Sequence, residues 1–441
     1  MVRRREVPLL VVAAALGAGC YLVVYRGAAL AGLGPLRNLA ATLAASVPYA
    51  VAVWAAGRLG SLSTRGTLGL LVGGAVALRL CLPADLLEGS DDAYRYLWDG
   101  RVIDAGVNPY RHAPSAPALA SLRDEVFHPR VFRPEMRTVY PPLAELWFWV
   151  AYRLAPGGFG GLKLVLLLHD VASALLLWWL LRRRGQPPLR ALVYAWSPLA
   201  VVQLFAGAHV DGLALPWCLL ALVLARRPAA AGAALGAAAM VRPSFALCVP
   251  ALALRRPWRE ALAAGGGAVG AAALLLAPFV RAGSLMWESL LVYARHWRFN
   301  GSLFRIVEAA LGPGGGARTA ALAGSGLLSI AAGLLPLALS GRFVLALAGY
   351  LALAPTVYPW YLLPLVALGA LYPGPLVVAL PALVGLSDLV FLPWLEARRW
   401  QVPRSALALE YGLVYGLLLW EGIRRWRRRP KGPAPTTASA R

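Results

Sequence analysis

Long apolar runs separated by short polar loops dominate the chain. A membrane-spanning helix needs about 20 mostly apolar residues, and runs near this length recur along the sequence. The candidate spans cover residues 7–25, 38–57, 66–82, 161–181, 190–208, 211–225, 229–254, 260–281, 317–340, 343–356, 360–372, 374–394 and 405–423. The pattern predicts an all-α polytopic membrane protein with roughly 11 to 14 transmembrane or re-entrant helices.

The composition strengthens this interpretation. Of the 441 residues, 59% are hydrophobic and only 14% are charged, whereas a soluble globular protein carries about 25% charged residues. A composition this apolar excludes a single soluble domain, and it equally excludes a disordered chain.

The charge is strongly basic, with 43 Lys and Arg against 20 Asp and Glu. Most basic side chains stand in short clusters between apolar runs, which is typical of cytoplasmic loops facing anionic lipid, and nucleic acid is not expected as a partner. The clusters predicted to be cytoplasmic are residues 3–5, 58–65, 182–184, 226–227, 255–259, 342 and 424–431. Both termini are then cytoplasmic. The cluster Arg398, Arg399 and Arg404 falls on the outer side and is an exception.

This orientation leaves the longest polar stretch, residues 83–141, outside the membrane. We expect one polytopic domain over residues 1–429, in which 83–141 forms an external catalytic loop with interfacial helices, followed by a flexible cytoplasmic tail over 430–441. Two segments do not fit simple spans. Residues 142–155 are short and are predicted to be interfacial or re-entrant. Residues 229–254 have predicted cytoplasmic loops at both ends, so we expect a helix that is broken at Arg242-Pro243, enters the membrane and returns. Broken backbone at membrane depth is tolerated only where protein or a wet cavity covers it, so this break could border a site.

Two adjacent carboxylates, Asp91 and Asp92, stand near the start of the external loop. Like charges at this spacing raise the pKa of one of them, which suits a general base that takes a proton from an acceptor hydroxyl. They could equally hold a divalent metal, or one could cap the helix predicted over 92–105. That helix is expected to lie on the bilayer surface with Tyr96 toward lipid and Arg95 pointing away from it.

Three further polar positions fall at the predicted outer ends of spans. Tyr140 precedes two prolines where the chain re-enters the membrane, a pattern that a simple turn would also explain. His209 and Asp211 occupy a tight turn between two spans. Such residues are costly at a span end unless they are paired or hydrated, so they are candidates for a binding site; the alternative is a turn cap.

Basic residues near the same side suit an anion. Arg242 lies within an apolar run, where its obvious role is to bind a phosphate, although it could instead extend to the interface. In residues 293–304, Arg295, His296 and Arg298 could bind a phosphate and Asn300 could bind sugar hydroxyls. A belt of aromatic and basic residues at the lipid headgroups is the alternative for this segment.

Aromatic residues break a late hydrophobic region at Tyr358-Pro359-Trp360. Tyr358 and Trp360 could stack on a sugar or an isoprenoid, or they could belong to an interfacial aromatic belt.

Six motifs occur in order along the chain: SDDAYRYLWDGRV followed by NPY (90–110), YPP (140–142), GAHVDGLALP (207–216), LGAAAMVRPSF (235–245), YARHWRFNGSLF (293–304) and PTVYPWYLLP (355–364). Together they resemble the polytopic glycosyltransferases of the GT-C fold that use a polyprenyl-phosphate sugar. The resemblance covers about residues 60–425 and is strongest to the bacterial group related to polyprenyl-phosphomannose-dependent mannosyltransferases.

The resemblance implies a GT-C-type fold and an inverting transfer of a hexose, most simply mannose, on the outer face of a bacterial plasma membrane. The sugar would leave a polyprenyl phosphate and join a glycan or lipid-linked acceptor. In such enzymes an acidic residue early in the first external loop is the base, which falls on Asp91 or Asp92, and His209 and Asp211 fall on the second polar position of the cavity. Relatives often carry Lys at the position of Arg242 and His at that of Tyr358, so those two roles do not transfer directly.

No organic cofactor is expected, because the donor is already activated by its phosphate, and the need for a divalent metal stays open. Two other functions compete with the enzyme. A transporter or flippase of a lipid-linked sugar would share the aromatic and basic cavity without needing a base, but it would favour inverted repeats, which we do not find in the sequence. The third alternative is a non-catalytic protein that binds a lipid or a partner.

Overall fold

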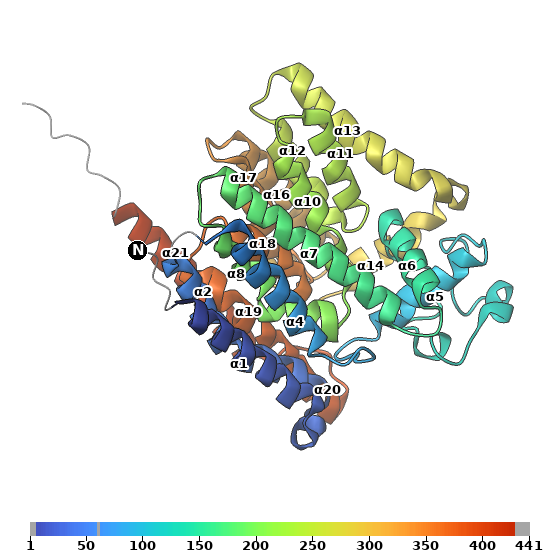
Figure 1. Cartoon of the computed structure of the whole chain (residues 1–441). Helices are drawn as coiled ribbons and strands as arrows, with labels where there is room; N and C mark the ends of the chain where they lie inside the picture. Colours follow the sequence, from blue (N-terminus) through green and yellow to red (C-terminus); the bar gives the residue numbers. More distant parts are fainter. Residues whose placement is uncertain (1–5, 60–61, 428–441) are drawn as a thin grey trace, which may run out of the picture.

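The computed structural model describes residues 6–59 and 62–427, and within them the chain is almost entirely helical (Figure 1). The β-type pairing in this part of the chain is limited to isolated bridges that join Phe299 and Asn300 to Thr356. The all-α prediction is therefore confirmed. The basic residues 3–5 and the predicted tail 430–441 lie outside the described residues.

The helices bundle around a buried apolar core, and the labels of Figure 1 follow chain order. They are α1 (Glu6–Arg26), α2 (Arg37–Arg58), α3 (Thr64–Leu68), α4 (Gly74–Leu80), α5 (Asp92–Asp104), α6 (Pro142–Leu154), α7 (Gly160–Arg183), α8 (Leu192–Ala195), α9 (Pro198–Val201), α10 (Leu215–Val223), α11 (Pro228–Ala239), α12 (Cys248–Ala253), α13 (Trp258–Leu276), α14 (Leu285–His296), α15 (Phe304–Leu311), α16 (Gly315–Leu334), α17 (Leu339–Leu353), α18 (Leu363–Gly369), α19 (Pro375–Gly385), α20 (Phe391–Ala397) and α21 (Arg404–Arg427). Short 3₁₀ or π segments, labelled η, join several of them.

Seven helices in the described part of the chain are long and apolar enough to cross a membrane, or eight if the bent pair Pro188–Ala195 and Pro198–Ala206 is one span. The outer helices carry apolar side chains on their exposed faces: on α13, Leu262, Val269 and Leu274 are 66%, 69% and 75% exposed. Exposed apolar surface on this scale suits contact with lipid. The chain is an integral membrane protein.

Several predicted spans are shorter in the structure than a full crossing. Over 211–225, 343–356 and 360–372 the apolar helices are Val210–Val223, Leu339–Leu353 and Pro359–Gly369. A helix rises about 1.5 Å per residue, so these helices fall short of the membrane core by themselves.

The predicted break at Arg242-Pro243 is present. Helix α11 ends at Ala239, and the chain resumes helical geometry at Pro243, because proline disfavours helical geometry in the residue before it. Arg242 is accordingly extended, with φ −141° and ψ 111°. The Met240 carbonyl accepts the backbone N–H of Leu143 at 2.9 Å. The start of α6 thus satisfies backbone that the break leaves open.

Small residues bring α11 and α13 into close contact, as the Ala- and Gly-rich composition favours. A Cβ added at Gly267 would lie 2.0 Å from the Ala229 carbonyl oxygen, and one added at Gly232 would lie 1.9 Å from that of Ala264. No side chain larger than hydrogen fits at these two positions without moving a helix.

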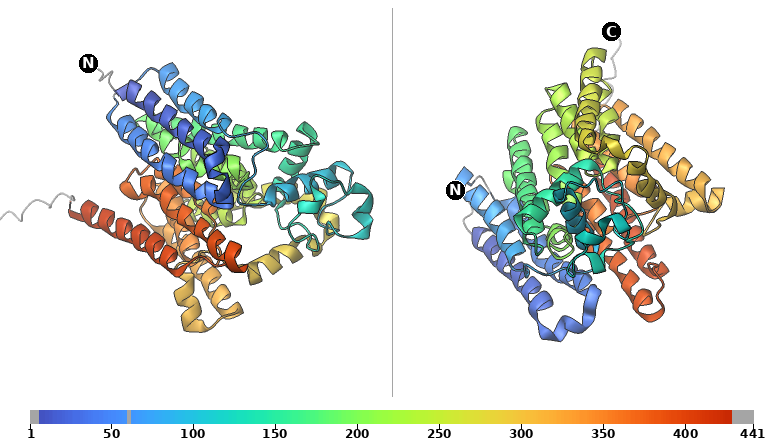
Figure 2. Two further views of the ribbon diagram at one scale, coloured as in Figure 1. Left: turned by 90° about the horizontal axis from the view of Figure 1, so that it is seen from below. Right: turned by 90° about the vertical axis from the view of Figure 1, so that its right-hand side faces the viewer.

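Several arginines of the predicted cytoplasmic loops donate hydrogen bonds to a neighbouring loop of the same group. Arg184 donates to Ser340 at 2.9 Å, Arg256 donates to the Ala225 carbonyl at 2.6 Å, and Arg342 donates to the Leu254 carbonyl at 3.1 Å. Seen from below in Figure 2, the start of α1 and the end of α21 lie at the end of the bundle opposite the segment with α5. The two described chain ends and the segment that is predicted to be external therefore lie at different ends of the molecule.

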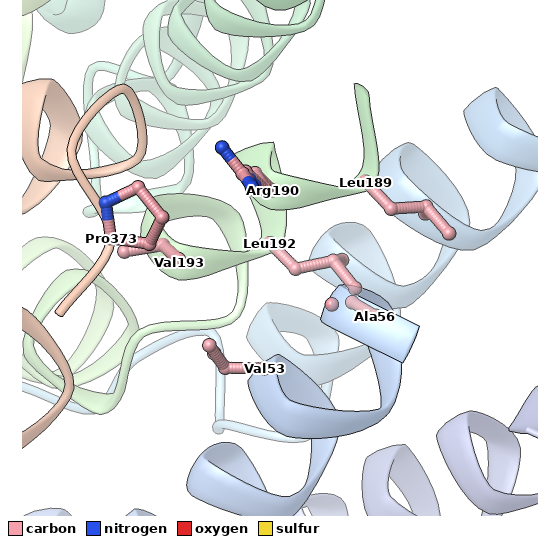
Figure 3. A pocket seen from close by; sticks show the side chains of 8 residues that line it. Val53, Ala56, Leu189, Arg190, Leu192, Val193 and Pro373 are labelled. Carbon is pink, nitrogen blue, oxygen red and sulfur yellow. The ribbon is translucent and has the colours of Figure 1, made fainter. Parts of the chain in front are cut away.

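A small cavity of about 120 Å³ lies beside the end of α2 (Figure 3). Its lining residues are Val53, Ala56, Gly57, Leu189, Arg190, Leu192, Val193 and Pro373. The lining is mostly apolar, and none of the predicted site residues contributes to it.

Helix α5 does not turn Tyr96 toward lipid as expected. Tyr96 is 1% exposed and Arg95 is 7% exposed, so both the apolar and the polar face of the helix are buried in protein. A Cβ added at Gly100 would lie 2.4 Å from the Phe148 carbonyl oxygen of α6, and the rings of Tyr96 and Phe148 stack with centroids 4.6 Å apart. The pattern of aromatic and charged residues predicts an amphipathic helix at the surface of the bilayer. In the structure the aromatic side chains pack against α6, and Arg95 pairs with Asp99.

Helix α6 has 13 residues, well under the length of about 20 that a crossing needs. This agrees with the prediction that residues 142–155 are not a simple span. Its exposed side is tied to α5, because Asp104 accepts from both Trp149 and Arg153 at 3.1 Å. The two short helices form one unit beside the bundle (Figure 1).

Candidate functional site

Asp92 is the first residue of α5 and faces inward at the end of the bundle. Its backbone N–H donates to Ser90 Oγ at 3.1 Å, and its Oδ2 lies 3.7 Å from His209 Nδ1. The side chain keeps 32% exposure. Burial, together with the nearby carboxylates of Asp211 and Asp91, raises the pKa of Asp92 to about 6. A carboxylate in this state can accept a proton near neutral pH.

Asp91 occupies a different environment from its neighbour. Its carboxylate pairs with Arg130 and is 46% exposed. Asp91 stands at the N-cap position of α5, but its side chain makes no capping hydrogen bond. The two adjacent carboxylates thus differ, because Asp91 is half-exposed beside Arg130 and Asp92 faces His209 in the interior.

His209 lies between Asp92 and an aromatic wall. Its ring stacks on Trp360 with centroids 3.4 Å apart, and Trp360 stacks on Tyr358 at 4.6 Å. Tyr358 stacks in turn on Phe299 at 4.3 Å, and Phe299 lies 5.9 Å from the ring of Trp400. We call these five residues the aromatic column. It joins three of the predicted residues, His209, Tyr358 and Trp360, in one continuous stack.

Asp211 and Arg242 form an ion pair beside Asp92. The Arg242 guanidinium lies over the ring of Tyr361, 3.3 Å from its centroid, and the Tyr361 hydroxyl meets that of Tyr293 at 2.7 Å. Asp211 is 7% exposed and Arg242 is 17% exposed at their side chains. The break before Pro243 is what directs this arginine into the site.

Tyr140 lies next to the start of α6. Its ring packs edge-on against Tyr96 and Phe148, with centroids 5.0 Å and 5.3 Å away. Its backbone carbonyl accepts the Tyr110 hydroxyl at 2.6 Å. Tyr140 therefore belongs to the same neighbourhood as α5.

Arg95 is directed away from the site into a buried cluster. Its Nε donates to both Asp99 oxygens at 2.8 and 2.9 Å, and its Nη1 donates to the Met136 carbonyl at 3.0 Å. Glu145 lies in the same cluster and accepts the Thr138 hydroxyl at 2.5 Å. Burial raises the pKa of Asp99 and raises that of Glu145 well above its usual value, with the charge of Asp99 adding to the effect on Glu145.

The four predicted site residues of 293–304 occupy different environments. Arg298 pairs with Glu308, and Arg295 and His296 are exposed at the end of α14. Asn300 is 3% exposed and donates to both oxygens of Glu410 at 3.0 and 3.2 Å. Asn300 thus anchors this segment to α21, a contact the sequence did not indicate.

The residues that could hold a metal do not converge. Among residues 6–59 and 62–427, no group of three or more His, Cys, Asp or Glu side chains is placed to bind one ion. Asp91 is directed to Arg130 and Asp211 to Arg242, while Asp92 faces His209.

Several contributors were not found from the sequence. Tyr361 under Arg242, Tyr293 and Arg130 were not singled out, although Tyr361 and Tyr293 stand within the motifs. The structure also pairs Asp170 with Arg79 at 2.6 Å in the helical core. This pair could have been predicted from the sequence, because Arg79 and Asp170 are opposite charges within two predicted spans.

The site therefore offers a half-buried carboxylate, a neutral ion pair with an aromatic face, and a wall of stacked rings. The carboxylate can take a proton, the guanidinium can attract an anion, and rings of this kind bind sugars or isoprenoids. These are the parts that transfer of a sugar from a phosphate carrier requires.

Two comparisons with known proteins found similar proteins. The profile described as alpha-(1->6)-mannopyranosyltransferase, N-terminal domain, matches residues 8–256, more than half of the chain. No curated protein sequence matches. The chain is similar to ArnT from Cupriavidus metallidurans, solved bound to undecaprenyl phosphate, with 16% identity and a TM-score of 0.45 over 82% of this chain and 73% of that one. By its profile match, the chain belongs to the alpha-(1->6)-mannopyranosyltransferase family.

Proposed function

We propose that this membrane glycosyltransferase moves mannose from a polyprenyl-phosphate carrier to a glycan or glycolipid acceptor. The transfer takes place on the outer face of the plasma membrane and inverts the anomeric centre, and Asp92 is the base. The family to which the chain belongs supports mannose. The resemblance of the six motifs supports the lipid carrier, the outer face and the inversion.

The observation that carries the proposal is the environment of Asp92. A base must lose its proton at the working pH and regain one during the reaction, which favours a pKa near neutrality. The pKa of Asp92 is raised to about 6 mainly by burial, while Asp91 next to it is half-exposed and paired with Arg130. We therefore assign the base to Asp92, and Asp91 to fixing the loop.

In this proposal the cation at the site is Arg242. Its charge is balanced by Asp211, and a planar guanidinium can share its remaining donors with a phosphate. The charge that develops on the departing phosphate is then stabilised in place. Arg295 and His296, exposed at the end of α14, are available to the more solvent-facing side of the same phosphate.

The aromatic column supports a second part of the proposal. Its rings run from His209, beside Asp92, to Trp400, which is 40% exposed. Stacked apolar rings that start at the base and end at the surface suit a sugar at the inner end and the first isoprene units at the outer end.

The test is transfer by the purified protein in proteoliposomes. Polyprenyl-phosphomannose, and the matching glucose and arabinose carriers, are supplied with a glycan acceptor, and products are identified by mass spectrometry. We expect mannose to be transferred fastest and the free polyprenyl phosphate to accumulate in equal amount. Preference for another sugar would correct the donor, and movement of intact donor across the bilayer without consumption would favour a transporter instead.

A further inference from the structure

The ring of His209 is fixed in one orientation. The side chain is 2% exposed, one face stacks on Trp360, and a Cβ added at Gly207 would lie 2.7 Å from Nε2. Its backbone N–H donates to the Gln203 carbonyl at 3.0 Å, which fixes the turn as well. A ring packed on its face and on one edge cannot flip without moving its neighbours.

The remaining edge of the ring carries a polar atom with no partner. Nδ1 of His209 is buried and makes no hydrogen bond within the described residues. Buried polar atoms are nearly always satisfied, so an exception needs an explanation. The group that Nδ1 faces is Oδ2 of Asp92, at 3.7 Å. A shift of less than 1 Å in either side chain would bring the two atoms into hydrogen-bond distance.

We propose that His209 is a positioning residue for Asp92, whose Nδ1–H donates to the Asp92 carboxylate, aims it at the acceptor and stabilises its anionic form. This role rests on the proposed function of Asp92 as the base. The reaction then moves one proton, from the acceptor hydroxyl to Asp92, while His209 keeps its own proton throughout.

The protonation states fit this role. Burial lowers the pKa of His209 to about 3, so the ring is neutral at pH 7 and carries a single N–H. A neutral donor favours the carboxylate without adding a full charge, and a neutral ring also stacks on Trp360 without burying an unpaired cation. Because Nδ1 faces the Asp92 carboxylate, we place the proton on Nδ1.

Among the other groups around Asp92, the side chain of Ser90 also stabilises the carboxylate, since its hydrogen bond lowers the pKa of Asp92, so His209 adds a second donor. Asp91 and Asp211 raise its pKa, and each is already paired with an arginine. Ser90 Oγ accepts the backbone N–H of Asp92. The titratable and charged groups around Asp92 are Asp91, Tyr96, Tyr140, His209, Asp211 and Tyr358, with Arg130 and Arg242 behind the two aspartates.

Two substitutions separate the donor from the ring. His209→Phe keeps a flat ring against Trp360 and removes the donor, whereas His209→Asn removes the ring and keeps an N–H near the position of Nδ1. His169→Phe is the matched control, because His169 is a partly buried histidine on α7 whose Nδ1 lies 2.8 Å from the Val165 carbonyl. The readout is the titration of the Asp92 carboxyl by infrared difference spectroscopy, with Asp92→Asn identifying the band.

We expect the midpoint of the Asp92 titration to rise by about one pH unit in His209→Phe, a tenfold change in proton affinity, and to stay near that of the unmodified protein in His209→Asn and His169→Phe. In transfer assays the acid limb of kcat/KM moves by the same amount. An unshifted titration in His209→Phe, or an equal shift in His209→Asn, overturns the inference whether or not the protein transfers mannose. A shifted titration in a protein that transfers no mannose overturns the proposed function alone.

Discussion

Replacing Asp92 by Asn tests the assignment of the base most sharply, because the neighbouring Asp91 provides a matched substitution. The Asn side chain keeps the size of Asp92 and removes the proton acceptor. General-base catalysis contributes typically about 10²- to 10⁴-fold, so we expect kcat to fall by about that factor. The pair of Asp91 with Arg130 is about half-exposed on both sides, and exposed pairs contribute about 0–1 kcal/mol. Asp91→Asn is therefore expected to cost less than about tenfold.

The pH dependence adds a second measure of the same prediction. Asp92 must be ionised to act, and its pKa is about 6 instead of the ordinary 3.8. Activity is then half-maximal near pH 6 and falls about tenfold for each further pH unit below it. An acid limb centred near pH 4 would show that the working carboxylate is an exposed one.

Stability distinguishes lost chemistry from a lost fold. A carboxyl whose pKa is raised by burial contributes stability below its unfolded pKa, and that stability is lost as the pH rises through the folded pKa. At pH 7.5 Asp92→Asn removes a buried charge, so its thermal unfolding temperature in detergent should equal or exceed that of the unmodified protein. Full transfer activity in Asp92→Asn, or equal losses in both variants, would refute the assignment.

Three further predictions concern the scaffold, each measured by thermal unfolding in detergent at neutral pH. Glu145 is fully buried and its pKa is raised well above the usual value, so Glu145→Gln should change stability by less than about 1 kcal/mol; a loss of several kcal/mol would mean that the side chain is ionised. Asp170→Ala should lower the free energy of unfolding by about 3–5 kcal/mol, because it leaves the buried charge of Arg79 without its carboxylate partner. An unchanged unfolding temperature would contradict the pairing. Gly267→Ala should cost about 1–3 kcal/mol, because the added methyl group enters the close contact of α11 and α13. The control is Gly266→Ala, whose Cβ meets nothing within 4 Å and which should be neutral or slightly stabilising. Similar effects at both glycines would argue against the close approach of the two helices.

The apolar pattern was sufficient to predict the helical membrane architecture and the break at Arg242. Each rests on a strong local rule, the length of apolar runs in one case and proline in a predicted span in the other. The predicted orientation of Tyr96 on α5 was wrong for the opposite reason. Its local pattern fits an interfacial helix equally well, and only the packing of Gly100 against α6 decides that Tyr96 faces protein.

In the candidate site, too, the sequence identified residues but did not specify their long-range contacts. The motifs named Asp92, His209 and Asp211, and the structure places these three side by side. Sequence alone could not separate Asp91 from Asp92, because the difference lies in Arg130, a residue 39 positions away from Asp91. It also could not show that Asn300 would bind Glu410, 110 positions away. Pairings at such separations depend on the fold and leave no periodic signal.

The central claim is a single inverting displacement from a lipid phosphate, and the anomeric configuration of the product tests it most directly. Purified protein is given polyprenyl-phosphomannose of defined β configuration, labelled with ¹³C at the anomeric carbon, together with a glycan acceptor. NMR of the glycan should then show the label as an α-mannoside, formed in the same amount as free polyprenyl phosphate. A β-mannoside, or label that stays on the carrier, would contradict the account.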